Sequence, residues 1–250
     1  MNHSKIEKNL ILIPARFSST RVKNKNLKKI NNKPLIYYRI RSSLQSKSGR
    51  VIVSTDSEKI AKIAKKFGAD VPFLRPKEIS RPKSSSISCI IHTLKWLKEN
   101  ENWFPDNIAF CPPTNPFINS IFLKKIFLLK KKKNINSIVT IYKPEVHPYN
   151  LISIKKSNRL LFGKYKINNF SWLDFERTQE WPIAYAQSPG IRITKAKYFI
   201  KYLNKNLNLV DHKTFDTKNC MGFKISQNEA FDINNKLDFI IAKDLFKSLK

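Results

Sequence analysis

The chain has 250 residues, of which 41% are hydrophobic, so it is long enough to bury a full core. Its formal charge of +30 is spread along the sequence without a zinc finger, an RNP-like strand or a basic region before heptads, so specific nucleic-acid reading is not indicated, whereas small anionic substrates are compatible with it. The three cysteines show no metal-ligand spacing and the apolar run Leu10 to Ile13 is too short for a signal core or membrane span, which predicts a reduced, cytoplasmic protein without a membrane partner.

The first 142 residues alternate short apolar runs with helical stretches, which is typical of βαβ units and a doubly wound, mostly parallel sheet. Strands are expected near 9–15, 50–54, 70–74, 107–111 and 136–142. Helices are expected between them near 34–47, 57–67, 85–99 and 119–132, and a last helix near 235–249 returns to the sheet. We therefore predict one α/β domain over 1–250.

Residues 143–190 break this alternation with several prolines and aromatic residues. They are predicted to form an inserted β-rich arm. Its apolar residues Tyr149, Phe162, Phe170 and Trp172 have no evident place in the sheet layers, so we expect the arm to pair with its copy in a twofold homodimer.

In an open α/β sheet the ligand lies outside the carboxyl ends of the strands. The first of these loops, residues 16–26, is basic and rich in hydroxyl groups, and it is predicted to hold a nucleotide phosphate. It lacks the glycines of a Walker loop or a dinucleotide-binding fingerprint, and a merely solvated basic loop is the alternative. After the second strand, Thr55 with Glu58 is typical of a capping box rather than of a catalytic acid.

Several blocks along the chain, taken together and in order, resemble CMP-acylneuraminate synthetases. These blocks are LIPAR (12–16), KNKNL (23–27), KPLIY (33–37), VIVSTDSEKIA (51–61), VPFLRP (71–76), SSSI (84–87), PTNP (113–116), HP (147–148), RTQE (177–180) and FDI (231–233). The resemblance implies a nucleotide-diphospho-sugar transferase-like fold. It also implies an enzyme that joins CMP from CTP to an acidic nine-carbon sugar and releases pyrophosphate.

The resemblance assigns roles to individual residues. Arg16 and Lys25 would contact the CTP phosphates, Asn26 the ribose or base, and Arg75 and Ser85 the base side of the pocket. An arginine at a strand end can offer a planar fork of donors, although a salt bridge to a nearby acid is the alternative for Arg75.

The resemblance also places Arg177 and Gln179 against the sugar, with a subunit-interface ion pair as the alternative for Arg177. Asp232, together with Asn234, would bind Mg²⁺. His147 is expected to be structural.

Two departures from the family pattern bear on activity. Asn234 stands where the family has a second aspartate, and Pro112 stands where it commonly has a glutamine. A nucleotide-binding relative with lost or reduced turnover is therefore one alternative function. The other is a cytidylyltransferase for a shorter acidic sugar such as Kdo, against which the RTQE block (177–180) argues.

Overall fold

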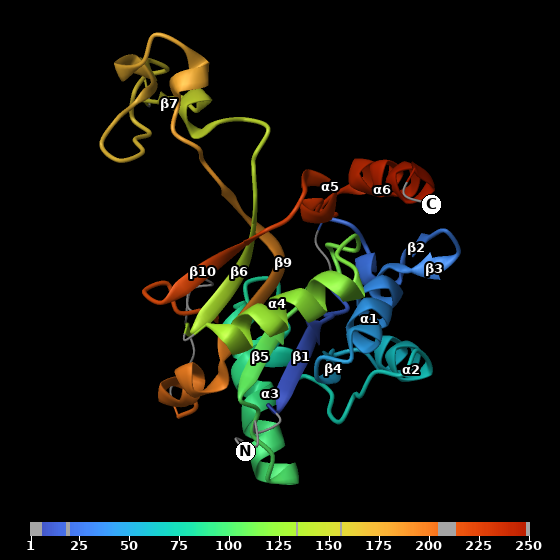
Figure 1. Cartoon of the computed structure of the whole chain (residues 1–250). Coiled ribbons are helices and arrows are strands. Elements are labelled where there is room, and N and C mark those ends of the chain that lie inside the picture. The colour runs from blue at the N-terminus through green and yellow to red at the C-terminus, as the bar shows by residue number, and fades with distance from the viewer. Residues whose placement is uncertain (1–6, 19–20, 134, 156, 205–213, 249–250) are drawn as a thin grey trace.

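A computed structural model describes residues 7–18, 21–133, 135–155, 157–204 and 214–248. Its centre is a six-stranded sheet in the order β10-β6-β9-β5-β1-β4 (Figure 1). Strand β9 is antiparallel to both of its neighbours, and the other pairs are parallel. The strand bounds are Asn9–Pro14 for β1, Arg50–Ser54 for β4, Asn107–Phe110 for β5, Ser137–Tyr142 for β6, Ala186–Lys195 for β9 and Cys220–Lys224 for β10.

Helices cover both faces of the sheet, as the expected doubly wound α/β fold requires. Leu10 and Leu12 of β1 pack toward α3 (Ser86–Glu101) and the 3-10 helix η6 (Ala196–Tyr202). Ile11 and Ile13 pack toward the opposite helices α1 (Leu35–Ser46), α2 (Glu58–Lys66) and α4 (Ser120–Lys132). All four side chains are fully buried, which is typical of a parallel strand between two helical layers.

The last helix, α6 (Lys236–Ser248), packs across one end of the domain. It follows the short helix α5 (Gln227–Ala230) and shares a small core with the ribbon of β2 (Lys29–Ile30) and β3 (Lys33–Pro34). Two further 3-10 turns, η1 (Lys25–Leu27) and η2 (Lys77–Ile79), lie in the loops. Within the described residues no helix is both long and apolar enough to span a bilayer.

The five long helices lie within two residues of the expected bounds, but the strands differ more. Residues 70–74 do not form a strand, because only Asp70 makes a bridge, with Ile52, before the chain turns away. Strands β9 and β10 were not expected. Pro189 lies inside β9 where the register with β6 shifts, a place where a missing N–H breaks no regular ladder bond.

The N-terminus of α2 also differs from the expected capping box. Ser57, rather than Thr55, is the capping residue, and its hydroxyl accepts the Ile60 N–H at 3.4 Å. Thr55 Oγ1 accepts the Ser57 N–H at 3.2 Å. Asp56 accepts the N–H of Phe17 at 2.7 Å, so it fixes the loop after β1.

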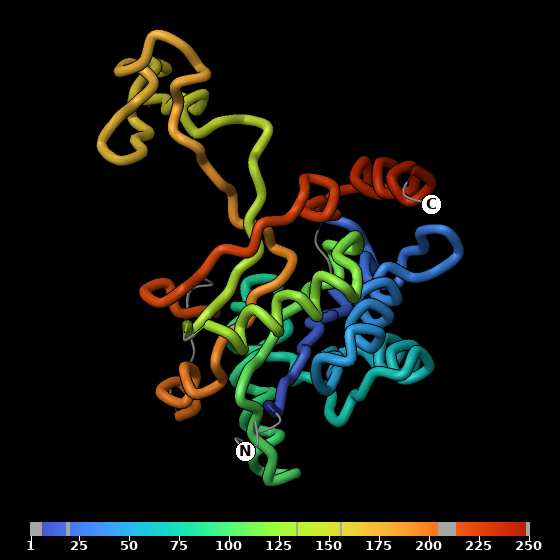
Figure 2. Tube along the Cα trace, viewed as in Figure 1, coloured from blue at the N-terminus to red at the C-terminus, as the bar shows by residue number. Residues whose placement is uncertain are grey.

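The arm projects away from the sheet between β6 and β9 (Figures 1 and 2). It holds less strand than expected, because the two-residue strands β7 (Ser153–Ile154) and β8 (Leu160–Leu161) are accompanied by the 3-10 turns η3 (Pro148–Asn150), η4 (Trp172–Asp174) and η5 (Thr178–Glu180). Tyr149 is buried inside the arm, and its hydroxyl donates to the Phe170 carbonyl at 2.8 Å. Phe162 and Phe170 remain 53% exposed.

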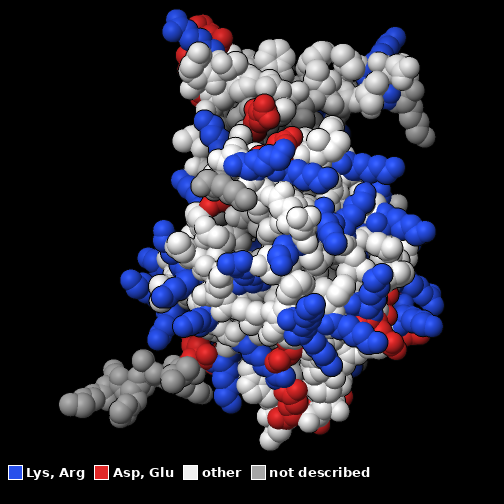
Figure 3. Space-filling model, turned by 90° about the vertical axis from the view of Figure 1, so that its right-hand side faces the viewer, with Lys and Arg blue, Asp and Glu red and all other residues white. Residues whose placement is uncertain are grey.

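The positive charge does not form a single stripe on the face that Figure 3 shows. Lysine and arginine side chains are distributed over the helical surface there, with few acidic residues among them. The three cysteines, Cys89, Cys111 and Cys220, are free thiols.

A fully buried arginine joins α1 to the loop after β5. Arg39 Nε donates to the Pro112 carbonyl at 3.2 Å, and its Nη2 donates to the Asn115 carbonyl. The Asn115 side chain in turn donates to the carbonyls of Glu229 and Phe231, both at 2.8 Å. This buried network ties the loop after β5 to the segment that follows α5.

We predict that Asn115→Ala lowers the free energy of unfolding by about 2–4 kcal/mol, because it removes two hydrogen bonds and leaves buried carbonyls unpaired. Urea unfolding of Asn115→Ala and of the exposed control Asn100→Ala measures this loss. The control should stay within about 0.5 kcal/mol of the parent. An equally small loss for Asn115→Ala would show that the network does not hold these segments together.

Candidate functional site

A cavity of about 300 Å³ opens at the carboxyl end of the parallel strands. Arg16 reaches it from the loop after β1, Ser85 from the start of α3, and Pro112 from the loop after β5. Arg75, which follows the bridge at Asp70, also lines it. Three predicted site residues, distant in sequence, therefore share one cavity with Pro112.

Arg75 is only 6% exposed, and its guanidinium is held in place by β4. Its Nε donates to Ser54 Oγ at 3.0 Å, its Nη2 donates to the Ser54 carbonyl, and its backbone N–H donates to Thr55 at 2.7 Å. Within the part of the chain that the structure describes, no acid forms a salt bridge with Arg75. The alternative of an ion pair at this position therefore finds no support.

Ser85 contributes an unpaired polar atom to the cavity. It occupies the N-cap position of α3, yet its hydroxyl makes no capping hydrogen bond. Its Oγ is buried and has no partner among the described residues. Because buried polar atoms are normally hydrogen-bonded, this hydroxyl is available to a bound ligand.

The loop after β1 is held at the mouth of the cavity by its own side chains. Arg16 Nη1 donates to the carbonyls of Arg81 and Pro82, at 2.9 and 3.1 Å. Asn26 is 7% exposed, and its amide donates to the Arg16 carbonyl at 3.0 Å. Asn26 therefore supports the backbone that presents Arg16, a role that sequence reasoning missed.

Lys25 lies beside this loop and next to the segment after α5. Its Nζ donates to the Ile233 carbonyl at 2.9 Å. Burial lowers its pKa from the ordinary value, the neighbouring Asp232 opposes that shift, and the cations Arg21 and Arg16 add to it. Lys25, Arg21 and Arg16 therefore form one positively charged group near the carboxylates of Asp232 and Asp238.

Asp232 and Asn234 are in direct contact. Asn234 Nδ2 donates to Asp232 Oδ2 at 2.7 Å, and Asn234 Oδ1 accepts from Arg21 at 3.0 Å. Asp232 Oδ1 is buried without a partner among the described residues. Arg21 had no predicted role, although it stands in the basic, hydroxyl-rich loop that the sequence singled out.

The donor set fits a divalent ion that arrives with a phosphate ligand. No cluster of three or more histidine, cysteine or acidic residues exists in the described ranges, so there is no all-protein cage. Mg²⁺ commonly binds through one or two carboxylates plus substrate phosphates, and the unpaired Asp232 oxygen supplies one such ligand. Asn234 has its amide oxygen on Arg21 and orients Asp232 through its nitrogen.

Arg177 and Gln179 are not brought to the cavity of their own chain. Both are exposed and lie at η5 in the projecting arm (Figure 1). His147, also in the arm, uses both ring nitrogens locally, with the Pro182 carbonyl at 2.9 Å and the Tyr149 N–H at 3.2 Å. The expectation that His147 is structural agrees with these contacts.

Comparison with known proteins places this geometry in context. The chain is 28% identical to an N-acylneuraminate cytidylyltransferase of Escherichia coli O18:K1:H7 over 93% of its own length, and spans 51% of that relative. It is 29% identical to a CMP-N,N'-diacetyllegionaminic acid synthase of Legionella pneumophila, covering 95% of this chain and 96% of that protein. The chain thus spans about half of the first relative and nearly all of the second.

The fold has a solved counterpart in CMP:2-keto-3-deoxy-manno-octonic acid synthetase complexed with CTP. The TM-score is 0.70 at 13% sequence identity, over 97% of this chain and all of that one, which establishes the shared α/β architecture. Residues 10–161, more than half of the chain, match the family model described as cytidylyltransferase. The chain therefore belongs to the cytidylyltransferase family.

Proposed function

We propose that the chain joins CMP from CTP to a nonulosonic acid, an acidic nine-carbon sugar, and releases pyrophosphate. The observation that carries the proposal is the cavity at the carboxyl ends of β1 and β5, where Arg16, Arg75 and the unpaired Ser85 hydroxyl converge. Relatives named for N-acylneuraminate and N,N'-diacetyllegionaminic acid support the sugar class.

The cytosine base is assigned to the part of the cavity between Arg75 and Ser85. Arg75 is fixed by Ser54, so its guanidinium can meet a base carbonyl without losing conformational freedom on binding. The Ser85 hydroxyl can accept from the cytosine amino group, which Pro112 cannot do through a side chain. The Pro112 carbonyl already accepts from Arg39.

The triphosphate is assigned to the positively charged group beside the cavity. Arg16 lines the cavity, and its positive charge contributes to the lowered pKa of Lys25, so the two cations lie close together. A phosphate placed there would favour the charged form of Lys25, opposing the burial that lowers its pKa. These cations would stabilise the negative charge that develops on the departing pyrophosphate.

Asp232 is the residue that would hold Mg²⁺, with Asn234 fixing its orientation at 2.7 Å. The ion, when bound, would neutralise negative charge on the phosphate oxygens. In the transfer, the sugar anomeric hydroxyl forms a new bond to the α-phosphorus, the bond from that phosphorus to the bridging oxygen breaks, and pyrophosphate leaves as the hydroxyl gives up its proton.

The arm is assigned to pairing with a second copy of the chain. Phe162, Phe170 and Leu173 are each more than half exposed, which leaves apolar surface for an interface. Arg177 and Gln179 are exposed on the same arm and distant from their own cavity, so the sugar carboxylate would meet them when they come from the other protomer. A twofold dimer satisfies both features.

We predict pyrophosphate release from CTP with a sialic, legionaminic or pseudaminic acid and much slower release with the eight-carbon Kdo. A coupled pyrophosphate assay over this panel measures it. Turnover of Kdo alone would establish the shorter-sugar alternative, and CTP binding without turnover of any sugar would establish a relative that has lost activity.

We also predict that Arg16→Ala weakens apparent CTP binding at least tenfold, since a charge-assisted phosphate contact is lost.

We predict that Asp232→Asn lowers kcat at least 100-fold at saturating Mg²⁺ and leaves the fold intact. The neutral amide removes the carboxylate that would hold the ion. Asp244→Asn is the matched control, because Asp244 lies on α6 and forms an exposed ion pair with Lys247. Circular dichroism checks folding of both variants. Activity of Asp232→Asn within twofold of the parent would move the metal site elsewhere.

A further inference from the structure

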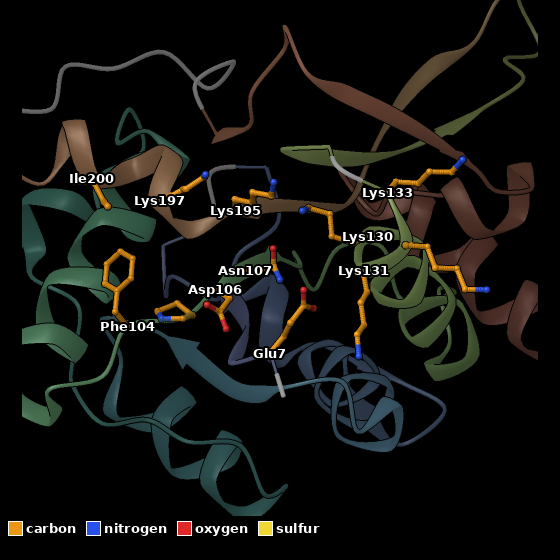
Figure 4. A pocket seen from close by; sticks show the side chains of 12 residues that line it. Glu7, Phe104, Asp106, Asn107, Lys130, Lys131, Lys133, Lys195, Lys197 and Ile200 are labelled. Carbon is orange, nitrogen blue, oxygen red and sulfur yellow. The ribbon is translucent and has the colours of Figure 1, made fainter. Parts of the chain in front are cut away.

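A second and larger cavity, of about 770 Å³, lies at the opposite end of the sheet (Figure 4). Glu7 stands before β1, Phe104 to Asn107 lead into β5, and the last turn of α4 supplies Lys130 to Lys133. Lys195 also lines it, because β9 runs against the parallel strands and so ends where they begin. The candidate functional cavity instead lies at the carboxyl ends of β1 and β5.

The lining of this cavity is strongly cationic. Six lysines and two carboxylates, those of Glu7 and Asp106, line it. Asp106 already accepts the Lys8 N–H at 2.8 Å. In Figure 4 the amino groups of Lys130 and Lys195 reach toward each other from α4 and β9. Among the described residues that line the cavity, lysines therefore outnumber acids.

Lys130 is the distinctive member of this set, because it is only 4% exposed. Within the described residues it makes no salt bridge. Burial, together with the neighbouring cations Lys195 and Lys197 and against the opposing effect of Glu7, lowers its pKa to about 8. A cation at a helix C-terminus is ordinary, but such a cation usually stays in water, whereas this one is withdrawn into a cavity.

The other wall of the cavity is apolar. Phe104, Pro105 and Ile200 line it, and Ile200 is 56% exposed. In Figure 4, Phe104 and Ile200 stand at the far end from Lys131 and Lys133. The volume falls within the roughly 300–1,000 Å³ typical of small-molecule sites. The cavity therefore offers cations at one end and a flat apolar surface at the other.

We propose that this cavity is a second ligand site, separate from the candidate functional site, for a nucleotide-sized anion with phosphate groups against Lys130 and its neighbours and a ring against Phe104 and Ile200. The site would act as an effector site, because it lies at the opposite end of the sheet from the candidate functional cavity. The proposal does not rest on the identity of the sugar that the enzyme uses.

The test is isothermal titration of the full chain with ATP as the probe. Lys130→Met with Lys197→Met should weaken ATP binding at least tenfold. Lys59→Met with Lys62→Met removes equal charge from the exposed face of α2 and should change it less than twofold. Arg16→Ala should likewise change it less than twofold. An equal loss of ATP affinity in the α2 variant would show that net positive charge, rather than this cavity, determines binding. A loss of affinity confined to Arg16→Ala would place ATP in the functional cavity.

Two further readouts separate a built site from a surface patch. Tripolyphosphate should bind at least fivefold more weakly than ATP because it has no ring for Phe104 and Ile200, and equal binding would overturn the ring assignment. ATP affinity of the parent should fall about tenfold from pH 7 to pH 9, as Lys130 deprotonates through a pKa of about 8. The other charged residues that line the cavity are Lys131, Lys132, Lys133, Lys195, Lys197, Glu7 and Asp106. An unchanged affinity at pH 9 would show that only ordinary exposed lysines bind.

Folding of the Lys130→Met variant can be checked independently. The lowered pKa means that the folded protein disfavours protonated Lys130, so below pH 8 this group costs stability, and stability recovers as pH rises from about 8 toward the unfolded value of 10.5. Methionine fills similar space without the charge. The variant should therefore melt a few degrees higher than the parent at pH 7, and a lower melting temperature would contradict burial of a charged amine.

Discussion

The candidate site depends on one buried polar network, in which the Arg39 guanidinium holds the carbonyls of Pro112 and Asn115. Asn115 then holds the C-terminal end of α5 through the carbonyls of Glu229 and Phe231. A fully buried cation is costly unless it is hydrogen-bonded, so these carbonyls are fixed where Arg39 needs them. The loop that lines the base cavity and the segment that carries Asp232 are thereby set relative to each other.

The electrostatics of the site follow from that arrangement. Lys25 bonds to the Ile233 carbonyl, which places its cation next to Asp232 while Arg21 holds Asn234. The three cations Lys25, Arg21 and Arg16 exceed the two carboxylates of Asp232 and Asp238, so an anion is favoured here. In the proposed function, a nucleotide triphosphate with its metal ion would supply the missing charges, and positioning rather than a strong general base would then account for most of the catalysis.

Much of the domain could be predicted from local pattern, because five helices with apolar residues at three- and four-residue spacing need little tertiary information. The strands β9 and β10 could not. Pro189 and Gly190 indicate a loop by composition, yet the ladder bulge accommodates the proline and the close approach of Asn115 and Ile118 requires the glycine. Tertiary contacts therefore override the local signal in the strand that reverses the sheet.

The position of the cavity could be predicted from the loops that follow the strands. The contacts that site residues make with one another could not be predicted. Arg16, Arg75 and Ser85 line one cavity at the carboxyl ends of the parallel strands, where ligands of open α/β sheets bind. The hydrogen bond from Asn26 to the Arg16 carbonyl had no signal in the sequence, and the expected contact of Asn26 with the ligand stays a prediction. The burial of Arg39 could not be predicted from the sequence, since an arginine within an amphipathic helix is usually exposed to solvent.

The most direct measurement compares kcat/KM for CTP and UTP in the parent and in Pro112→Gln. If Arg75 and Ser85 select the base, the parent prefers CTP and still uses UTP at a measurable but lower rate. Its discrimination against UTP should be several-fold weaker than that of a protein with glutamine at this position, since one neutral hydrogen bond is worth about 0.5–1.5 kcal/mol. Pro112→Gln should sharpen the preference. Equal rates with CTP and UTP in the parent would contradict the assignment of the cavity to cytidine.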